Sequence, residues 1–259
     1  MTAARRILLG LLPKVALSRL TGLATRLPLP ASLRPGFFAW FGRRYGASLE
    51  EVAGDLRDYR SLFAFFQRPL RTGARPIESA AAFVWPCDGK VVTAGRIEGE
   101  RIPQVKGVDY GLDEFVGDPR LGAALAGGSQ VTVYLAPGDY HRVHAPFDGQ
   151  IVGVRQIPGT LFPVNQPAVR AVPGLFVRNA RVVFEARLAD GRPAAIVMVG
   201  ALNVGHIHES VAAGDSIARG DEVGRFGFGS TTVVIVGPGD ANLPAVAGET
   251  VVRMGRGVR

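Results

Sequence analysis

The chain has 259 residues, enough for one large domain or for one domain with an appendage. Hydrophobic residues make up 47% of it, which excludes an intrinsically disordered protein, and its single cysteine excludes an intrachain disulfide framework. The formal net charge is +8, and the whole excess lies before Glu50, the first acidic residue. A basic end of this kind favours an anionic partner, either nucleic acid or a lipid surface.

Residues 14–27 predict an amphipathic helix. Leucine and alanine recur at helical spacing on one face, and lysine, arginine, serine and threonine occupy the other. A leucine face opposite a basic face is typical of a helix that lies at a membrane interface. The segment "FFAWFGRRYG" (37–46) adds aromatic residues beside arginines, which suits the headgroup boundary. The same pattern also allows a helix packed on its own domain, but it lacks the polar context of a nucleic-acid-binding surface.

The chain has no run of 18 apolar residues, so no segment is expected to span a bilayer. The start "ARRILLGLL" is similar to the beginning of a signal peptide, but Pro13 and Lys14 interrupt its apolar region. We therefore expect a retained anchor, peripheral on the cytoplasmic face of the cytoplasmic membrane.

Two short helices are expected next. Ser48 and Glu51 have the spacing of a capping box, which predicts a helix running toward Tyr59. A second helix is predicted over residues 61–66, ending before Pro69. Together with the basic segment, these helices predict a helical membrane-associating region over residues 1–75.

From Phe83 onward the pattern is that of β-structure. Short β-branched runs alternate with glycine, proline and aspartate, and six of them are predicted as strands: 90–95, 130–136, 150–154, 181–188, 194–200 and 231–236. We therefore expect an α+β fold, with N-terminal amphipathic helices and a mostly antiparallel β-rich catalytic domain over residues 76–259. The turns "PCDG", "PFDG", "AAGD" and "ARGD" are similar to those of sandwich-barrel hybrid domains, or they reflect only common turn chemistry.

The four histidines occur in two pairs. His141 and His144 would point to opposite faces of a strand, whereas in a turn both could face one site. His206 and His208, in "GHIHES", would face the same way on a strand, which suits zinc. Both pairs also allow a purely structural interpretation.

The segment "GRFGFGSTTVVIV" places Gly229 and Ser230 at the edge of a predicted strand. Glycine leaves the peptide carbonyl unshielded, and the serine hydroxyl can attack that carbonyl when a base takes its proton. Gly-Ser alone is usually an ordinary turn. With a histidine, and with Asp88 to fix the histidine tautomer, it forms a more specific Ser-His-Asp set.

Six motifs, in their order and spacing, resemble the bacterial membrane-bound phosphatidylserine decarboxylases. They are "KVALSRLTGLATR", "FFQRPLRTGARPI", "PCDGKV", "APGDYHRVHAPFDG", "VPGLFVRNARVV" and "GRFGFGSTTVVIV". The resemblance covers nearly the whole chain, and "DYHRVHAP" combined with a late "GST" is its most specific part.

The resemblance implies a proenzyme that cuts itself between Gly229 and Ser230. A large chain, 1–229, would stay associated with a small chain, 230–259, and Ser230 would become an N-terminal pyruvoyl group. Asp88, His144 and Ser230 match the self-cleavage triad of the family, with His144 oriented by Asp88. His141 matches the position associated with decarboxylation.

The implied activity converts phosphatidylserine to phosphatidylethanolamine and CO2. The pyruvoyl group would form a Schiff base with the substrate amine and accept the electrons left by CO2, which agrees with the scarcity of lysine in the chain. The segment "LFPVN" is also similar to a family segment, and Phe162 and Asn165 are predicted to line the substrate pocket. An anionic membrane surface is the expected partner, whereas nucleic acid and a bound metal are not expected.

Two other functions remain open from the residues alone. A zinc hydrolase would use His206, His208 and one histidine of the first pair, with Asp148 as a further ligand, but it leaves the Gly-Ser segment unexplained. A non-enzymatic membrane-binding module would bind lipid through residues 1–46 without self-processing. The oligomeric state is also open, a homo-oligomer included.

Overall fold

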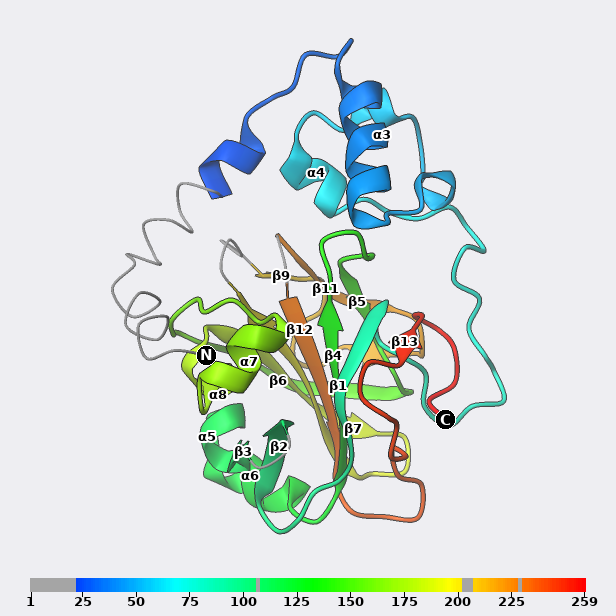
Figure 1. The fold of residues 1–259 in the computed structure, drawn as a ribbon. Helices are drawn as coiled ribbons and strands as arrows, with labels where there is room; N and C mark the ends of the chain where they lie inside the picture. The colour runs from blue at the N-terminus through cyan, green and yellow to red at the C-terminus, as the bar shows by residue number, and fades with distance from the viewer. Residues whose placement is uncertain (1–21, 106–107, 202–206, 228–229) are drawn as a thin grey trace.

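The computed structural model describes residues 22–105, 108–201, 207–227 and 230–259, which form a mixed helical and antiparallel fold (Figure 1). The predicted class is therefore confirmed as a mixture of helices and antiparallel sheet. Most of the amphipathic helix predicted over residues 14–27 lies outside the described residues, and only residues 22–26 of it are seen as helix. Within the described ranges, none of the helices has the length and hydropathy to cross a membrane.

The first part of the described chain is a small helical unit with its own aromatic core. Helix α3 (Arg34–Tyr45) is followed by the 3-10 turns η1 (Leu49–Glu51) and η2 (Leu56–Asp58) and by helix α4 (Leu62–Phe66). Phe38 of α3 stacks on Phe65 of α4 with 4.4 Å between ring centroids. These rings belong to a hydrophobic cluster distinct from the one that fills the β-rich part.

One predicted helix of this region is confirmed and the other is wrong. The side chain of Ser61 caps α4 by accepting a hydrogen bond from the backbone N–H of Ala64, as the predicted helix over residues 61–66 requires. The capping box at Ser48 does not form, and only the three-residue turn η1 follows it. The reason is that the Glu51 carboxylate pairs with Arg75 and Arg253 instead of turning back to accept from the backbone N–H of Ser48.

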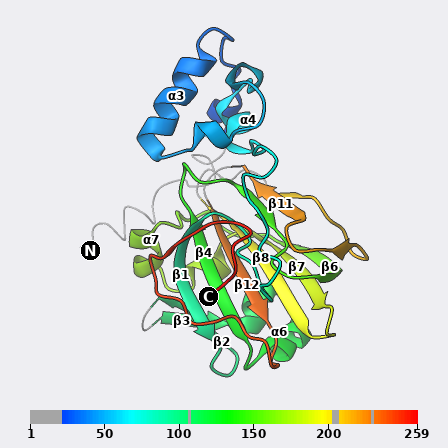
Figure 2. The ribbon, with the colours of Figure 1, turned by 90° about the vertical axis from the view of Figure 1, so that its right-hand side faces the viewer.

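All six predicted strands occur in one eight-stranded sheet with the order β10-β6-β7-β8-β12-β4-β1-β13. Every neighbouring pair is antiparallel, and Figure 2 shows the twist of the sheet. The strands are β1 (Gly89–Arg96), β4 (Ser129–Leu135), β6 (Gly149–Ile157), β7 (Arg181–Leu188), β8 (Pro193–Gly200), β10 (Ser216–Ile217), β12 (Ser230–Val236) and β13 (Val251–Val252). Every residue of β12 is buried, which explains its continuous β-branched sequence.

Shorter elements surround this sheet, and the sequence did not predict most of them. Strands β5 (Arg142–His144), β11 (Glu222–Phe226) and β9 (Ile207–Glu209) form a three-stranded sheet in the order β5-β11-β9. Strands β2 (Arg101–Val105) and β3 (Val108–Gly111) form a hairpin. Four short helices complete the described chain: α5 (Leu112–Val116), α6 (Pro119–Leu125), α7 (Gln166–Ala171) and α8 (Leu175–Arg178).

One end of the large sheet brings the predicted site segments together. Ser230, the first residue of β12, pairs with Leu135 at the end of β4 and with Gly200 at the end of β8. Asp88 directly precedes β1, on the other side of β4, so its backbone lies about two strand spacings, roughly 10 Å, from that of Ser230. The helical unit lies over this end of the sheet (Figure 1).

Candidate active site

Ser230 is fully buried, and its Oγ atom has no hydrogen-bond partner among the described residues. The hydroxyl of the next residue, Thr231, shares this property, so the unpaired hydroxyl alone does not single out the serine. Ser230 differs because it begins β12 and follows Gly229 in the sequence, although Gly229 itself lies outside the described residues. A buried hydroxyl without a partner costs free energy, and its position at the start of β12, after Gly229, is what makes Ser230 the candidate for chemistry.

The loop after β4 carries the first histidine pair to the same place. Its turn closes when the backbone N–H of Ala136 donates to the Asp139 carboxylate at 2.6 Å. The backbone N–H of Phe226 then donates to the carbonyl of His141 at 3.0 Å. This bond places His141 beside the end of β11, only four residues before Ser230 in the sequence.

His141 is held as a neutral imidazole. Its Nδ1 atom lies 2.9 Å from the carbonyl oxygen of Asp139, and because a carbonyl only accepts, Nδ1 carries the proton. Its ring lies against Phe66 of the helical unit, with 4.5 Å between centroids. Complete burial lowers the pKa of His141 to about 3, although the bond to Asp139 opposes this. At neutral pH its Nε2 atom therefore holds a lone pair.

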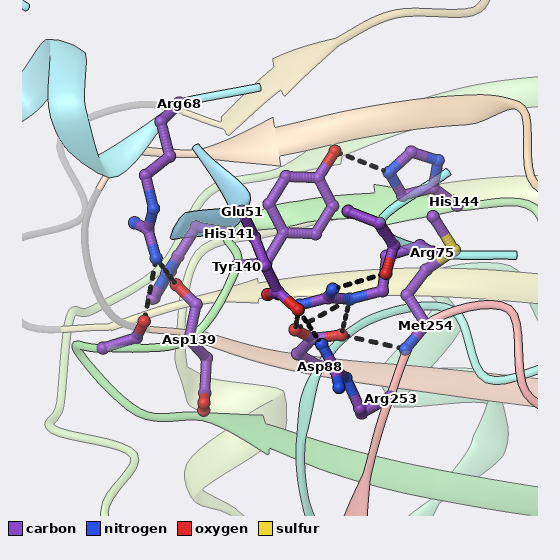
Figure 3. Close-up of polar contacts among 12 residues, drawn as sticks. Glu51, Arg68, Arg75, Asp88, Asp139, Tyr140, His141, His144, Arg253 and Met254 are labelled. Carbon is purple, nitrogen blue, oxygen red and sulfur yellow. Dashed lines mark hydrogen bonds and ion pairs between the residues drawn. The ribbon is translucent and has the colours of Figure 1, made fainter. Parts of the chain in front are cut away.

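His144 is oriented by two groups that the sequence analysis did not identify. Its Nδ1 atom lies 2.7 Å from the carbonyl oxygen of Gly220, so Nδ1 carries the proton. Its Nε2 atom accepts a hydrogen bond of 3.1 Å from the hydroxyl of Tyr140, whose ring stacks beside it (Figure 3). Burial lowers the pKa of His144, which leaves Nε2 as a neutral base.

The turn that presents the Gly220 carbonyl is one of the predicted Gly-Asp turns. The carboxylate of Asp221 accepts a 2.8 Å hydrogen bond from the backbone N–H of Ala218, and Gly220 has a φ of +94°. The backbone of Ala145 bonds this turn twice, by accepting from Gly220 at 2.9 Å and donating to Asp221 at 2.8 Å. The position of the carbonyl is thus fixed by the backbone next to His144 itself.

The backbone around Asp88 lies close to that of His144, but the Asp88 carboxylate bonds other groups than the His144 ring. The backbone N–H of His144 donates to the carbonyl of Pro86 at 2.8 Å, which joins the two segments. Asp88 is only 8% exposed, and its oxygens accept hydrogen bonds from Arg75, at 2.5 and 2.9 Å, and from the backbone of Met254, at 2.9 Å. The orientation of His144 by Asp88, expected from the family resemblance, is therefore not the contact observed.

A cavity of about 180 Å³ lies between the helical unit and this end of the sheet, and charged side chains contribute to its lining. Arg68, from the end of α4, is buried there and donates to the carbonyls of Gly138 (2.8 Å) and Asp139 (3.1 Å). Burial lowers the pKa of Arg68 to about 10, and burial raises the pKa of Asp139. The charged and hydroxyl side chains in the lining are Ser48, Glu51, Arg68, Arg75, Asp88, Asp139, Tyr140 and Arg253.

The two residues predicted to line a substrate pocket have structural contacts. Asn165 caps α7 by accepting a hydrogen bond from the backbone N–H of Ala168. Phe162 is buried under the guanidinium of Arg178 at 4.7 Å, and its backbone N–H donates to the side chain of Asn179. Neither lines the cavity beside Asp88, so their contact with substrate stays a prediction.

The second histidine pair is only half described. His208 lies in β9, paired with Arg225 of β11, and His206 falls outside the described residues. Asp148, the further zinc ligand considered above, accepts from the backbone and the side chain of Arg219 at 2.8 and 3.0 Å. In the described part of the chain, no three His, Cys, Asp or Glu residues are grouped so as to hold a metal ion.

Sequence reasoning missed four groups at this site: Arg75, Tyr140, Gly220 and Met254. Tyr140 had a usable signal, because it stands inside the same short motif as the two histidines. Arg75 and Gly220 also stand in quoted segments, "FFQRPLRTGARPI" and "ARGD", but no local signal pointed to their contacts with Asp88 and His144. Met254 had no signal, because its partner Asp88 lies 166 residues away.

Comparison with known proteins gives a consistent result. A family model described as "Phosphatidylserine decarboxylase" matches residues 62–259. Among curated relatives named "Phosphatidylserine decarboxylase proenzyme", that of Anaeromyxobacter sp. (strain K) is 41% identical over 95% of this chain and 94% of its own. The relative from Pseudomonas aeruginosa (strain LESB58) is 42% identical over 88% of this chain and 86% of its own length. The relative from Myxococcus xanthus (strain DK1622) is 35% identical over 96% of this chain and 95% of its own length.

Proposed function

The chain belongs to the phosphatidylserine decarboxylase family, and we propose that it is a self-processing proenzyme that converts phosphatidylserine to phosphatidylethanolamine and CO2. Cleavage between Gly229 and Ser230 leaves the large chain 1–229 and the small chain 230–259, and Ser230 supplies the pyruvoyl group. One observation carries the proposal: the buried Ser230 hydroxyl has no partner among the described residues. It lies at the end of the sheet where Asp88 and the loop with His141 and His144 also lie.

Self-cleavage begins when Oγ of Ser230 attacks the carbonyl carbon of Gly229. The C–N bond breaks, an ester bond to Oγ forms, and the hydroxyl proton passes through a base to the freed amine. Removal of the Cα proton of Ser230 then expels the Gly229 carboxylate. Hydrolysis of the resulting enamine by one water releases ammonia and leaves the pyruvoyl group.

His144 is the base in this proposal, and Nε2 is the atom that takes the proton. The bond from Nδ1 to the Gly220 carbonyl supports this assignment, because it leaves the lone pair on Nε2. The Tyr140 hydroxyl that now donates to Nε2 must turn away when the Ser230 hydroxyl takes its place. Asp88 acts by charge: the carboxylate of Glu222 and, to a smaller extent, that of Asp88 favour the imidazolium that forms on His144, and Asp88 does so without bonding the ring.

The pyruvoyl group, once formed, supplies an electrophilic carbonyl that takes the substrate amine and accepts the electrons released with CO2. His141 holds and moves a proton at its Nε2 atom during decarboxylation. Since Nε2 is unprotonated in the neutral ring, it first receives a proton and then returns it. Burial of this ring against Phe66 also keeps water away from the reacting carbon.

The helical region docks on the anionic cytoplasmic membrane face, in this proposal. Its described residues present several large apolar side chains to solvent, namely Leu23 (65% exposed), Leu27 (62%), Leu33 (60%) and Trp40 (50%). The exposed arginines at the end of α3, Arg43 and Arg44, lie within about one helical turn of Trp40. Apolar anchors with adjacent basic side chains bind interfaces that carry anionic lipid.

The activity is tested with vesicles that contain phosphatidylserine labelled with ¹³C at the serine carboxyl. The proposal expects labelled CO2 and an equal amount of phosphatidylethanolamine, both absent with Ser230→Ala. A folded, cleaved wild-type protein that forms neither product would contradict the proposed substrate.

A further inference from the structure

The buried carboxylate of Asp88 is held from two sides. The guanidinium of Arg75 donates to it through Nε, at 2.9 Å, and Nη2, at 2.5 Å, which is the two-pronged geometry of a strong arginine–carboxylate pair. The backbone N–H of Met254 donates to the same carboxylate at 2.9 Å. The side chains of Arg75 and Asp88 are only 8% and 11% exposed, so water screens this pair little.

Arg75 is itself fixed by groups of the helical unit and its own loop. Its Nη2 also pairs with Glu51 of η1 at 3.0 Å, and its Nη1 donates to the carbonyl of Ala74 at 2.8 Å. The second oxygen of Glu51 pairs with Arg253. Burial raises the pKa of the Glu51 carboxyl, but the hydrogen bonds from Arg75 and Arg253 outweigh burial and hold that pKa below its ordinary value.

These contacts form a closed ring (Figure 3). Asp88 bonds Arg75, Arg75 bonds Glu51, Glu51 bonds Arg253, and the next residue, Met254, returns to Asp88. The ring joins the helical unit, the segment before β1 and the C-terminal segment. It also joins the two chains that the proposed cleavage would create, because residues 253 and 254 belong to the small one.

We propose that Arg75, held by Glu51, is a positioning residue for Asp88 in self-cleavage. The inference rests on the proposed function, because Asp88 matters to the reaction only if the chain processes itself. The physical argument is that a carboxylate acting on His144 by charge must stay in a fixed position. The Arg75 fork holds it there through two nitrogens, and the bond from Arg75 to Glu51 makes the helical unit part of the positioning of Asp88.

The test follows self-cleavage of the full chain in a cell-free synthesis reaction, with intact-mass detection over time. Arg75→Ala is expected to slow cleavage by about 10-fold to 100-fold, and Glu51→Gln by less, because it loosens the fork without removing it. Arg71→Ala is the matched control. Arg71 lies four residues away and bonds the carbonyl of Val52, the neighbour of Glu51, so its loss leaves the Asp88 contacts intact.

Rescue separates positioning from a general loss of folding. Methylguanidinium added to Arg75→Ala can occupy the vacated site, so it is expected to restore cleavage several-fold and to leave Arg71→Ala unchanged. Arg75→Lys should keep part of the rate, because it retains the charge without the fork. Self-cleavage of Arg75→Ala at the wild-type rate would overturn the proposal. Slow cleavage that neither methylguanidinium nor Arg75→Lys improves would also overturn it and would leave Arg75 a structural residue.

The wild type and Ser230→Ala, run alongside, distinguish this failure from that of the proposed function. If the folded wild type stays uncut, self-processing itself is wrong. If the wild type is cut, Ser230→Ala is not and Arg75→Ala keeps the wild-type rate, only the role of Arg75 is wrong.

Discussion

The Nδ1 atom of His144 lies 2.7 Å from the carbonyl oxygen of Gly220. This contact decides which nitrogen of the ring acts as the base, because the carbonyl requires a proton on Nδ1 and leaves the lone pair on Nε2. In a serine–histidine–aspartate set the carboxylate usually performs this task. Here a backbone carbonyl performs it, and Asp88 is bonded to Arg75 and Met254.

Gly220→Ala tests the importance of this carbonyl. The new Cβ would lie 2.6 Å from Ile77, and the φ of +94° disfavours alanine, so the turn must move. We expect self-cleavage to slow several-fold. Gly214→Ala is the matched control, because Gly214 has a φ of +97° in the sister turn, and a Cβ added there would meet no heavy atom within 4 Å. Equal cleavage rates in the two variants, measured by intact mass, would show that the carbonyl position is unimportant.

The two histidines are expected to separate by function. His144→Ala removes the base and should block or strongly slow self-cleavage, and Asp88→Asn should do the same. His141→Ala should leave cleavage largely intact and lower the decarboxylation of the cleaved protein, by about 100-fold or more for loss of an acid–base group. Cleavage is followed by intact mass and decarboxylation by CO2 release. Blocked cleavage in His141→Ala with normal cleavage in His144→Ala would reverse the assignment.

The pH dependence of self-cleavage follows from the burial of His144. Burial lowers the pKa of His144 below the ordinary histidine value of 6.5, so the ring stays neutral as the pH falls through that value. A general base works in its neutral form. The rate should therefore be level around neutral pH and decline only below about pH 6.5. A cleavage rate that already falls on acidification from pH 8 to pH 7 would contradict this expectation.

Membrane binding should depend on the arginines at the end of α3. Reversing the charge of both Arg43 and Arg44 should weaken sedimentation with anionic vesicles by at least 10-fold, since each basic side chain near such a surface contributes about 1 kcal/mol. Reversal of the exposed Arg96 and Arg120 changes the net charge equally on the β-rich part and serves as the control. Equal losses in both double variants would indicate an effect of net charge and not a docking face.

The large strands were predictable because their signals are local. Each of the six β-branched runs lies in a strand, and in four of these strands, β4, β7, β8 and β12, most side chains are buried. In β1 and β6 most side chains are partly or fully exposed, and there the β-branched residues and the flanking turns carry the signal. The failed helix after Ser48 shows the limit of such signals. Glu51 had the right spacing for a capping box, but two arginines distant in sequence bind its carboxylate.

Only part of the candidate site could be predicted from the sequence, namely the part with local signals. The motifs around Asp88, the histidine pair and Ser230 could be found because they are continuous in the sequence. The contacts that orient them could not, because the Gly220 carbonyl, the Arg75 fork and the Met254 N–H reach the site through tertiary packing.

The central claim is that the chain cuts itself at Ser230, and an intact-mass spectrum of the purified protein tests it most directly, with Ser230→Ala measured alongside. We expect two masses in the wild type, corresponding to residues 1–229 and to residues 230–259 with a pyruvoyl group in place of the N-terminal serine, and one uncut mass in Ser230→Ala. A single uncut mass in a folded, soluble wild-type preparation would contradict the self-processing mechanism.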